Sequence, residues 1–285
     1  MKTSTEIASI YRQVGEERAI ELVAKAGFDA WDFSMSGYFT FDWNKGVVLD
    51  RDCPFRSSEY LPFVRRLKQV GLDNGIHCNQ SHAPFPSHVK EISDYFKRSI
   101  ECTAEAGGNI CVIHPDNRRT AAQNAEMYNE LLPFAKEYGV KIATENMWAW
   151  DVEANKASFA VCATAESFKE HLDLVNDDYL VACVDIGHAE MMGEIASADS
   201  LIKALGSKVQ ALHIHDNDRW HDSHQIPFSM DIDFTKVAKA LKEINYSGYL
   251  TLECDAYIKS AENIEEKVKN LCDSVKRFDE IIEQV

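Results

Sequence analysis

The sequence has few basic residues for its length. In 285 residues, 30 Lys and Arg stand against 46 Asp and Glu, which gives a formal net charge of −16. A chain this acidic repels phosphate backbones, so we expect no nucleic-acid partner. No apolar run approaches the roughly 18 residues that a membrane span needs, so we expect no membrane partner. The first residues, MKTSTEIASIYRQVGEERAI, lack the apolar segment of a signal peptide, which predicts a cytoplasmic location.

The sequence also lacks paired cysteines, linkers and phosphate loops. Its eight cysteines are scattered and include no Cys-x-x-Cys pair. Half of them lie in or beside strand-like apolar runs, where cysteine usually serves as a small buried hydrophobe: Cys78, Cys111, Cys183 and Cys254. We therefore expect no disulfide framework and no zinc ribbon. No low-complexity tract, Pro/Gly-rich linker or glycine-rich phosphate loop is visible, so residues 1–285 are predicted to form one domain.

A short β-rich run, a polar loop and an amphipathic helix follow one another repeatedly along the chain. The predicted strands are Lys2–Ala8, Phe28–Phe33, Gly75–Asn79, Asn109–His114, Val140–Glu145, Leu180–Asp185, Val209–His213 and Tyr249–Glu253. The predicted helices are Glu16–Ala26, Tyr60–Val70, Ile92–Ala106, Ala121–Tyr138, Ala165–Val175, Phe234–Ile244 and Ile264–Ile282. Eight strands that alternate with helices over this length predict an α/β fold, a single closed (β/α)8 TIM barrel.

Two of the segments that follow strands are long. Ser34–Ser58 is rich in aromatic residues, and Met147–Ala163 contains Trp148 and Trp150. Loops after the strands of a barrel lie on its catalytic face, so both segments are interpreted as pocket walls or lids. Aromatic side chains serve subunit contacts equally well, so a homo-oligomer that uses these loops is an equal alternative.

Residues that can bind a metal recur at the ends of the predicted strands: His82, His114, Glu145, Asp185, His213 and Glu253. A closed parallel barrel brings these ends together at one face. One such residue alone is more often structural, but burying six together without a cation would cost many kcal/mol. The sequence therefore predicts a divalent metal site of nitrogen and oxygen ligands, which suits Mn²⁺, Zn²⁺, Co²⁺ or Mg²⁺.

Further polar residues follow these strand ends. His188 comes three residues after Asp185, and His213 and His215 point to the same side of a strand. Arg219 is a cation within an acidic region. It is suited to binding a substrate oxygen, and nearly as well suited to a surface ion pair.

Several short motifs, each weak alone, follow one another in an informative order: His82-Ala-Pro-Phe85, Ile113-His114-Pro115, Thr144-Glu145-Asn146, Asp185-Ile-Gly-His188, His213-Ile-His-Asp216 and Leu252-Glu253. In order and spacing the sequence resembles the xylose isomerase-like TIM-barrel superfamily. That superfamily holds the sugar phosphate isomerases/epimerases, the ketose 3-epimerases and the apurinic endonucleases of the endonuclease IV type. The resemblance spans the third to the eighth predicted strand.

The resemblance implies a ligand set and a function. One divalent ion would be bound by four residues: Glu145, Asp185, His213 and Glu253. Glu145 and Glu253 would also act as acid and base on opposite faces of a sugar, as in the ketose 3-epimerases. Residues expected to bind substrate are His82, His114, His188 and Arg219. The function implied is a metal-dependent sugar or sugar-phosphate isomerase/epimerase that abstracts a proton and forms a metal-stabilised enediolate, with a carbohydrate as its partner.

Three other functions stay open. A keto-cyclitol (inosose-type) dehydratase begins with the same proton abstraction but expels water. An endonuclease IV-like enzyme would use a nine-residue ligand set that is present here: His82, His114, Glu145, Asp185, His188, His213, Asp222, His224 and Glu253. The acidic balance opposes it, and since sugar-acting relatives also keep an Asp-x-His in this loop, Asp222 and His224 are candidates for an additional metal. The last alternative is a catalytically silent metal- or sugar-binding barrel.

Overall fold

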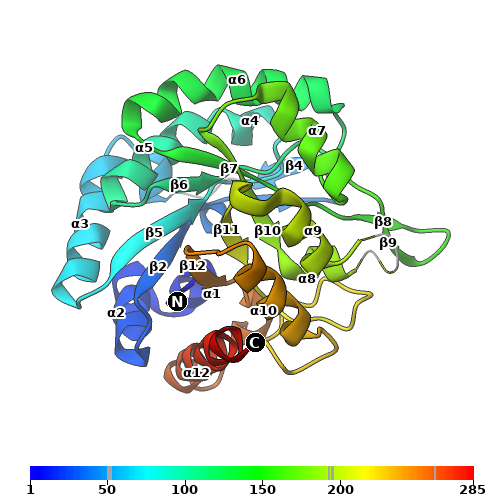
Figure 1. Cartoon of the computed structure of the whole chain (residues 1–285). Coiled ribbons are helices and arrows are strands. Elements are labelled where there is room, and N and C mark those ends of the chain that lie inside the picture. The colour runs from blue at the N-terminus through cyan, green and yellow to red at the C-terminus, as the bar shows by residue number, and fades with distance from the viewer. Residues whose placement is uncertain (50–52, 192, 194–195, 260) are drawn as a thin grey trace.

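The computed structural model describes residues 1–49, 53–191, 193, 196–259 and 261–285 of the chain. Strands lie at its centre and helices surround them (Figure 1). Six parallel strands form one curled sheet in the order β11-β10-β7-β6-β5-β2. Their bounds are β2 (Ala30–Ser34), β5 (His77–His82), β6 (Ile110–Val112), β7 (Lys141–Glu145), β10 (Leu180–Asp185) and β11 (Val209–His213).

The first and the last of the predicted strands pair with each other. β1 (Lys2–Thr5) runs parallel to β12 (Tyr249–Leu252) as a two-stranded sheet. A single parallel bridge connects Glu6, just after β1, to Asp32 of β2, and another connects Ile214, just after β11, to β12. All eight predicted strands are therefore present in an α/β fold, as a curled sheet of six and a pair that is bridged to both of its ends.

The seven predicted helices are also present, with small shifts of their ends. They are α2 (Glu16–Ala26), α3 (Tyr60–Asp73), α5 (Phe96–Ala106), α6 (Ala121–Tyr138), α7 (Ala165–Val175), α10 (Phe234–Glu243) and α12 (Ile264–Gln284). Their amphipathic faces pack on the strands and on neighbouring helices. Among the helices that the structure describes, none combines the length and the apolar character needed to cross a bilayer.

Four short helices of the described chain were not predicted, namely α1 (Ala8–Val14), α8 (Ile186–Glu190), α9 (Ala198–Leu205) and α11 (Asp255–Ile258), and a fifth, α4 (Lys90–Ser93), was predicted only in part. Each has at most eight residues, which is too short for a helical period to emerge from the sequence. The predicted helix Ile92–Ala106 begins instead as α4, and α5 follows after a break. The predicted strand Lys2–Ala8 ends at Thr5 because the chain turns into α1.

Three of the strand ends differ from the prediction by a few residues. β5 extends to His82, which is its last residue instead of lying beyond the strand. His114 lies two residues after β6, and Glu253 directly follows β12. All three side chains nevertheless belong to the carboxyl ends of parallel strands, which is where the barrel argument places them.

The two long segments contain antiparallel hairpins that the sequence did not predict. Ser34–Ser58 carries β3 (Thr40–Asp42) and β4 (Val47–Leu49), and its residues 50–52 lie outside the described part of the chain. Met147–Ala163 carries β8 (Ala149–Asp151) and β9 (Lys156–Ser158), whose hairpin projects from the body of the molecule (Figure 1). Strands of three residues are too short to show an alternating pattern.

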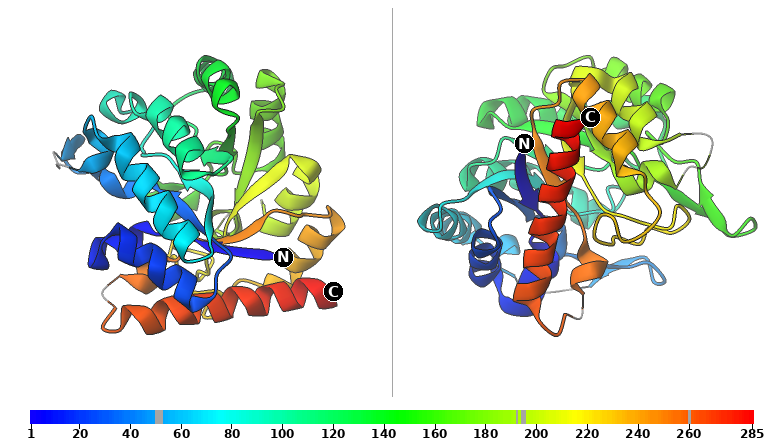
Figure 2. Two further views of the ribbon diagram at one scale, coloured as in Figure 1. Left: turned by 90° about the vertical axis from the view of Figure 1, so that its left-hand side faces the viewer. Right: turned by 60° about the horizontal axis from the view of Figure 1, so that its bottom comes forward.

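Both ends of the chain lie on the same side of the molecule (Figure 2). The N-terminal amine forms an ion pair with Asp279 of α12, so the last helix is fastened to the first strand. Cysteines contribute to the core as small hydrophobes, since seven of the eight are buried and the described cysteines form no disulfide bond.

Tyr128 of α6 links the helix layer to two strand ends. Its side chain is fully buried. The hydroxyl lies 2.9 Å from the Ile113 carbonyl oxygen and 2.8 Å from the hydroxyl of Thr144. These two residues immediately precede His114 and Glu145, so Tyr128 helps to position both.

We expect Tyr128→Phe to lower the free energy of unfolding by about 1–3 kcal/mol, because it removes the partner of two buried polar groups. Urea unfolding of the two proteins measures the difference. Tyr257→Phe is the matched control, since the Tyr257 hydroxyl accepts only an exposed hydrogen bond from Asn270. An equal loss of stability in both variants would contradict the role assigned to Tyr128.

Candidate functional site

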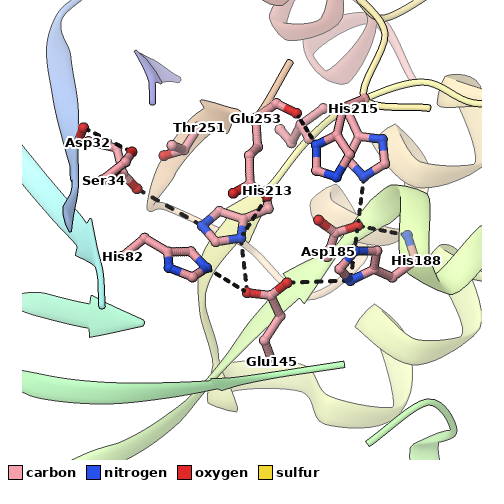
Figure 3. Close-up of polar contacts among 12 residues, drawn as sticks. Asp32, Ser34, His82, Glu145, Asp185, His188, His213, His215, Thr251 and Glu253 are labelled. Atoms are coloured by element: carbon pink, nitrogen blue, oxygen red, sulfur yellow. Dashed lines mark hydrogen bonds and ion pairs between the residues drawn. The ribbon is translucent and has the colours of Figure 1, made fainter. Parts of the chain in front are cut away.

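Four side chains from the ends of β7, β10, β11 and β12 converge at one point (Figure 3). Glu145 Oε2 lies 3.0 Å from His213 Nδ1, which lies 3.4 Å from Glu253 Oε2. With Asp185, each of the four offers one ligand atom within 4.8 Å of the others. The structure thus brings together the four residues predicted to share an ion, and we call them the first cluster.

Several potential ligand atoms of the first cluster lack the hydrogen bonds that buried polar atoms normally have. Both carboxylate oxygens of Glu145, Oδ2 of Asp185 and Nδ1 of His213 are buried without a hydrogen-bond partner among the described residues. Each such group costs roughly 1–3 kcal/mol unless something satisfies it. Three carboxylates and one imidazole fit a divalent cation, which would satisfy all of these atoms.

A thiol also lies beside this cluster. Cys183 of β10 offers a sulfur close to Glu145 and His213. Burial raises the pKa of the Cys183 thiol to about 12. The expectation that Cys183 is a buried hydrophobe is confirmed.

The two glutamates of the first cluster differ in acidity. Burial raises the pKa of Glu253 to about 8. Burial acts in the same direction on Glu145, but the imidazoles of His213 and His114 outweigh it and hold the Glu145 pKa well below its usual value. The first cluster has three carboxyl groups and one imidazole, so its histidine alone cannot neutralise it when all three are ionised. This is a second observation that fits a cation.

A carboxylate that the sequence analysis missed lies behind His213. Asp32 of β2 is buried, and its Oδ2 lies 4.0 Å from His213 Nε2. Gln80 donates to Oδ2 of Asp32 at 2.9 Å, and Ser34 donates to Oδ1 at 3.1 Å. A carboxylate on the far side of a metal-binding imidazole commonly orients the ring. The only signal in the sequence is one acidic residue within the strand AWDFS, all of whose residues the structure buries.

His82 and His114 contact each other and Glu145. Their Nε2 atoms are 2.9 Å apart, and His114 Nε2 lies 3.3 Å from Glu145 Oε2. His82 donates from Nδ1 to the carbonyl of Ala83 at 2.7 Å, and burial lowers the pKa of this ring. His82 is therefore neutral, with its proton on Nδ1. Its Nε2 lone pair accepts a hydrogen bond from Nε2 of His114.

A second cluster adjoins the first and consists of His188, His215, Asp222 and His224. Asp222 Oδ1 lies 3.1 Å from Nε2 of His224 and 3.6 Å from Nε2 of both His188 and His215. His215 Nε2 also lies 3.2 Å from Oδ1 of Asp185, so Asp185 lies between the two clusters. Asp222 Oδ1 and both ring nitrogens of His215 are buried without a hydrogen-bond partner.

Two imidazoles of the second cluster are oriented by backbone carbonyls. Nδ1 of His188 donates to the Asn146 carbonyl at 2.9 Å, and Nδ1 of His224 donates to the Glu253 carbonyl at 2.8 Å. In the neutral ring this leaves each Nε2 lone pair directed at Asp222, as in many metal-binding histidines. Burial alone would lower the pKa of His188, but Asp185 and Asp222 raise it to about 10. A proton or a cation thus compensates these carboxylates.

The surroundings of Gly187 explain why the motif Asp185-Ile-Gly-His188 has a glycine at its third position. A Cβ atom at Gly187 would lie 1.9 Å from Cε1 of His215, which no packing tolerates. The His215 ring therefore packs directly on the backbone of α8, whose first turn is held by the Asp185 carboxylate through a 2.7 Å bond from the His188 amide. The glycine thus gives both clusters their close approach.

Arg219 lies apart from the other predicted residues. Its guanidinium lies 3.5 Å from a carboxylate oxygen of Glu190, and about half of the side chain is exposed. The placement matches the ion-pair alternative of the sequence analysis, while its role in substrate binding stays a prediction.

A cavity of about 640 Å³ lies over both clusters. It is lined at the clusters by His82, His114, Glu145, His188, Asp222, His224 and Glu253, and further out by residues that include Trp43, Phe85, Met147, Trp148 and Trp150. Both long segments therefore contribute walls. Among the residues that the structure describes, Arg118, which the sequence analysis missed, is the one Lys or Arg that lines this cavity, and it suits a negatively charged or oxygen-rich part of a ligand.

Curated relatives of the chain include proteins that act on sugars. The uncharacterized protein MJ1311 of Methanocaldococcus jannaschii is 25% identical over 93% of this chain and 85% of its own length. An inosose dehydratase of Clostridium perfringens is 25% identical over 51% of this chain and 50% of its own. A fructoselysine 3-epimerase of Escherichia coli O157:H7 is 29% identical over 45% and 44%. The similarity spans about half the length of these two enzymes.

Solved structures show the same fold. A D-tagatose 3-epimerase-like protein superimposes with a TM-score of 0.73 at 22% identity, over 100% of this chain and 99% of that one. The D-psicose 3-epimerase of Clostridium cellulolyticum H10 superimposes with a TM-score of 0.69 at 17% identity, over 99% of both chains. Similarity at these identities shows a TIM-barrel fold.

The family model for xylose isomerase-like TIM barrels matches residues 20–275, which is most of the chain. The matched region contains every member of both clusters. The resemblance inferred from the short strand-end motifs is thereby confirmed, and the chain belongs to the xylose isomerase-like TIM-barrel family.

Proposed function

We propose that the protein is a metal-dependent sugar isomerase or epimerase that moves a proton at the carbon next to a carbonyl group. The observation that carries this proposal is the pair Glu145 and Glu253. Both flank His213, both line the cavity, and both oxygens of Glu145 lack hydrogen-bond partners. The names of the epimerases among the relatives and structural neighbours support a sugar as substrate.

The proposal includes a single closed barrel over residues 1–285 as its scaffold. Support comes from the two bridges at Glu6 and Ile214, which link the β1–β12 pair to both edges of the six-stranded sheet. Closure keeps the carboxyl ends of β7 and β12 at one face, so that their two glutamates can flank the same substrate.

The first cluster is the proposed metal site, with Glu145, Asp185, His213 and Glu253 as ligands. Bound there, Mn²⁺, Zn²⁺, Co²⁺ or Mg²⁺ would polarise the substrate carbonyl as a Lewis acid and make the adjacent C–H more acidic. Asp222 and His224, with His188 and His215, are proposed to hold an additional ion, since their ligand atoms converge as well.

The chain's own residues would carry the proton. One of Glu145 and Glu253 removes the proton next to the carbonyl, and the other returns a proton from the opposite face. His82, His114 and His188 line the same cavity, where they can bind substrate hydroxyl groups. Arg219 would join them only by exchanging its ion pair with Glu190 for a substrate oxygen.

Two other reactions compete with this one. A keto-cyclitol dehydratase shares the first proton abstraction, and an inosose dehydratase is among the relatives. An apurinic endonuclease is favoured by the adjoining clusters, which together contain seven of the nine residues of its ligand set, while the other two, His82 and His114, lie beside Glu145. The net charge of −16 opposes binding of a DNA duplex, and within the described part of the chain Arg118 is the one Lys or Arg at the cavity.

Metal binding should depend on Asp185 more than on any exposed carboxylate. We expect Asp185→Asn to weaken Mn²⁺ binding by about tenfold or more, since it removes a buried ligand. Equilibrium dialysis with elemental analysis measures this, and Asp178→Asn, at a side chain 99% exposed, is the control. Asp222→Asn should keep the ion of the first cluster. Unchanged Mn²⁺ affinity in Asp185→Asn would refute the assignment.

Turnover of a ketose in D₂O should place deuterium on the product carbon next to the carbonyl. Glu145→Gln and Glu253→Gln should each lower kcat by a factor of about 10² or more, because each removes an acid/base group. Mass spectrometry and NMR of the product follow both the label and its position. Glu243→Gln, at an exposed carboxylate on α10, should leave kcat unchanged.

The same experiment separates the competing reactions. Loss of water with an unsaturated or dicarbonyl product would identify a dehydratase. Epimerised product without deuterium would indicate intramolecular hydride transfer and refute proton transfer by the two glutamates.

The chain should not incise a duplex that contains an abasic site at physiological salt, because its acidic surface repels the phosphate backbone. A labelled oligonucleotide with one abasic site, incubated with Mn²⁺- or Zn²⁺-loaded protein, tests this. Rapid metal-dependent incision would place the nuclease ahead of the epimerase.

A further inference from the structure

The cavity is larger than proton transfer on a simple sugar requires. At about 640 Å³ it has room for roughly 20 water molecules of about 30 Å³ each. That number exceeds the heavy atoms of a free hexose. A hexose that reaches the first cluster therefore leaves the outer part of the cavity unfilled.

The outer part of the cavity has an aromatic wall, which consists of Trp43, Phe85, Trp148 and Trp150. Trp43 lies in the turn of the β3–β4 hairpin, and Trp148 and Trp150 belong to the segment of the β8–β9 hairpin. Segments about a hundred residues apart in sequence thus present flat apolar side chains to one space. Trp43 is 64% exposed and Phe85 is 40% exposed, so the described residues leave much of the surface of both rings uncovered.

The aromatic wall contacts residues beside the first cluster and within the second. The Phe85 ring stacks on His114 at a centroid distance of 5.0 Å, and the Trp148 indole N–H donates to Asp222 at 3.1 Å. A ligand whose reacting carbons lie at Glu145 and Glu253 would therefore meet these rings with its remaining part. Large apolar surfaces next to a polar site are typical of a ligand that combines both characters.

We infer that the substrate is a conjugated sugar. It carries, remote from the reacting carbons, a substituent with a flat apolar face that stacks on the aromatic wall. This inference rests on the proposed function and names its substrate class. An aryl group and a second sugar ring both present such a face, and the test distinguishes them.

The experiment compares one keto sugar in three forms: free, as its phenyl glycoside and as its disaccharide with glucose. Deuterium incorporation from D₂O gives kcat/KM for each form with the Mn²⁺-loaded protein. We expect kcat/KM to be about tenfold or more higher for at least one conjugate than for the free sugar, mainly through a lower KM. A preference for the phenyl form identifies an aryl substituent, and a preference for the disaccharide identifies a second sugar.

Tryptophan variants connect that preference to the wall. Trp43→Ala and Trp150→Ala should each reduce the ratio of kcat/KM between conjugate and free sugar by about fivefold, since each removes one stacking surface. Trp220→Ala is the matched control, because Trp220 is 59% exposed and does not line the cavity. It should leave the ratio unchanged.

Three outcomes would overturn the inference or its premise. Equal kcat/KM for the free and conjugated sugars refutes the conjugated substrate and leaves the proposed function intact. Absence of label in every sugar refutes the proposed function itself. A dimer in analytical ultracentrifugation that Trp43→Ala and Trp150→Ala dissociate, without any change in the kcat/KM ratio, shows that the wall covers a second copy of this chain.

Discussion

Uncompensated negative charge at the ends of the strands is the constraint on which the rest of this structure depends. Glu145, Asp185 and Glu253 crowd around His213 in a space that excludes most water. Like charges this close cannot all be ionised at low dielectric constant, and the pKa of Glu253 is raised by burial first and by the charges of Glu145 and Asp185 in addition. At the proposed metal site, a divalent cation would remove this conflict for all three carboxylates. The arrangement that makes folding without an ion costly would then also supply the affinity for one.

The scaffold supports this arrangement with rigid parts. Each ligand lies on or directly after a parallel strand, while Tyr128 fastens the strand ends that precede His114 and Glu145. Gly187 lets the His215 ring contact the backbone of α8, and Asp32 lies behind His213. Side chains held by such contacts lose little entropy when an ion binds, so the site is organised before the ion arrives.

The sequence predicted most of the fold, because its strands and long helices have distinct periods. It also predicted all four residues of the first cluster, because they recur at strand ends and match the motifs of the family that the sequence resembles. It did not predict the β3–β4 and β8–β9 hairpins, whose strands are too short to show alternation. Asp32 was missed because it lies within a strand instead of at its end. The placement of Arg219 beside Glu190 depends on how a loop folds back, which no local pattern records.

For the proposed function, the two hairpins would make the chemistry of the clusters selective. Carboxylates and imidazoles near a cation would act on many polar ligands, and what limits access is the wall above them. Trp148 connects the aromatic wall to the second cluster, since its ring lines the cavity and its N–H donates a hydrogen bond to Asp222. A substituent that stacks there would therefore displace water beside the second cluster while the reacting carbons lie at the first. Binding energy from the remote part of a substrate can then position the carbons that react, which is how such contacts raise turnover as well as affinity.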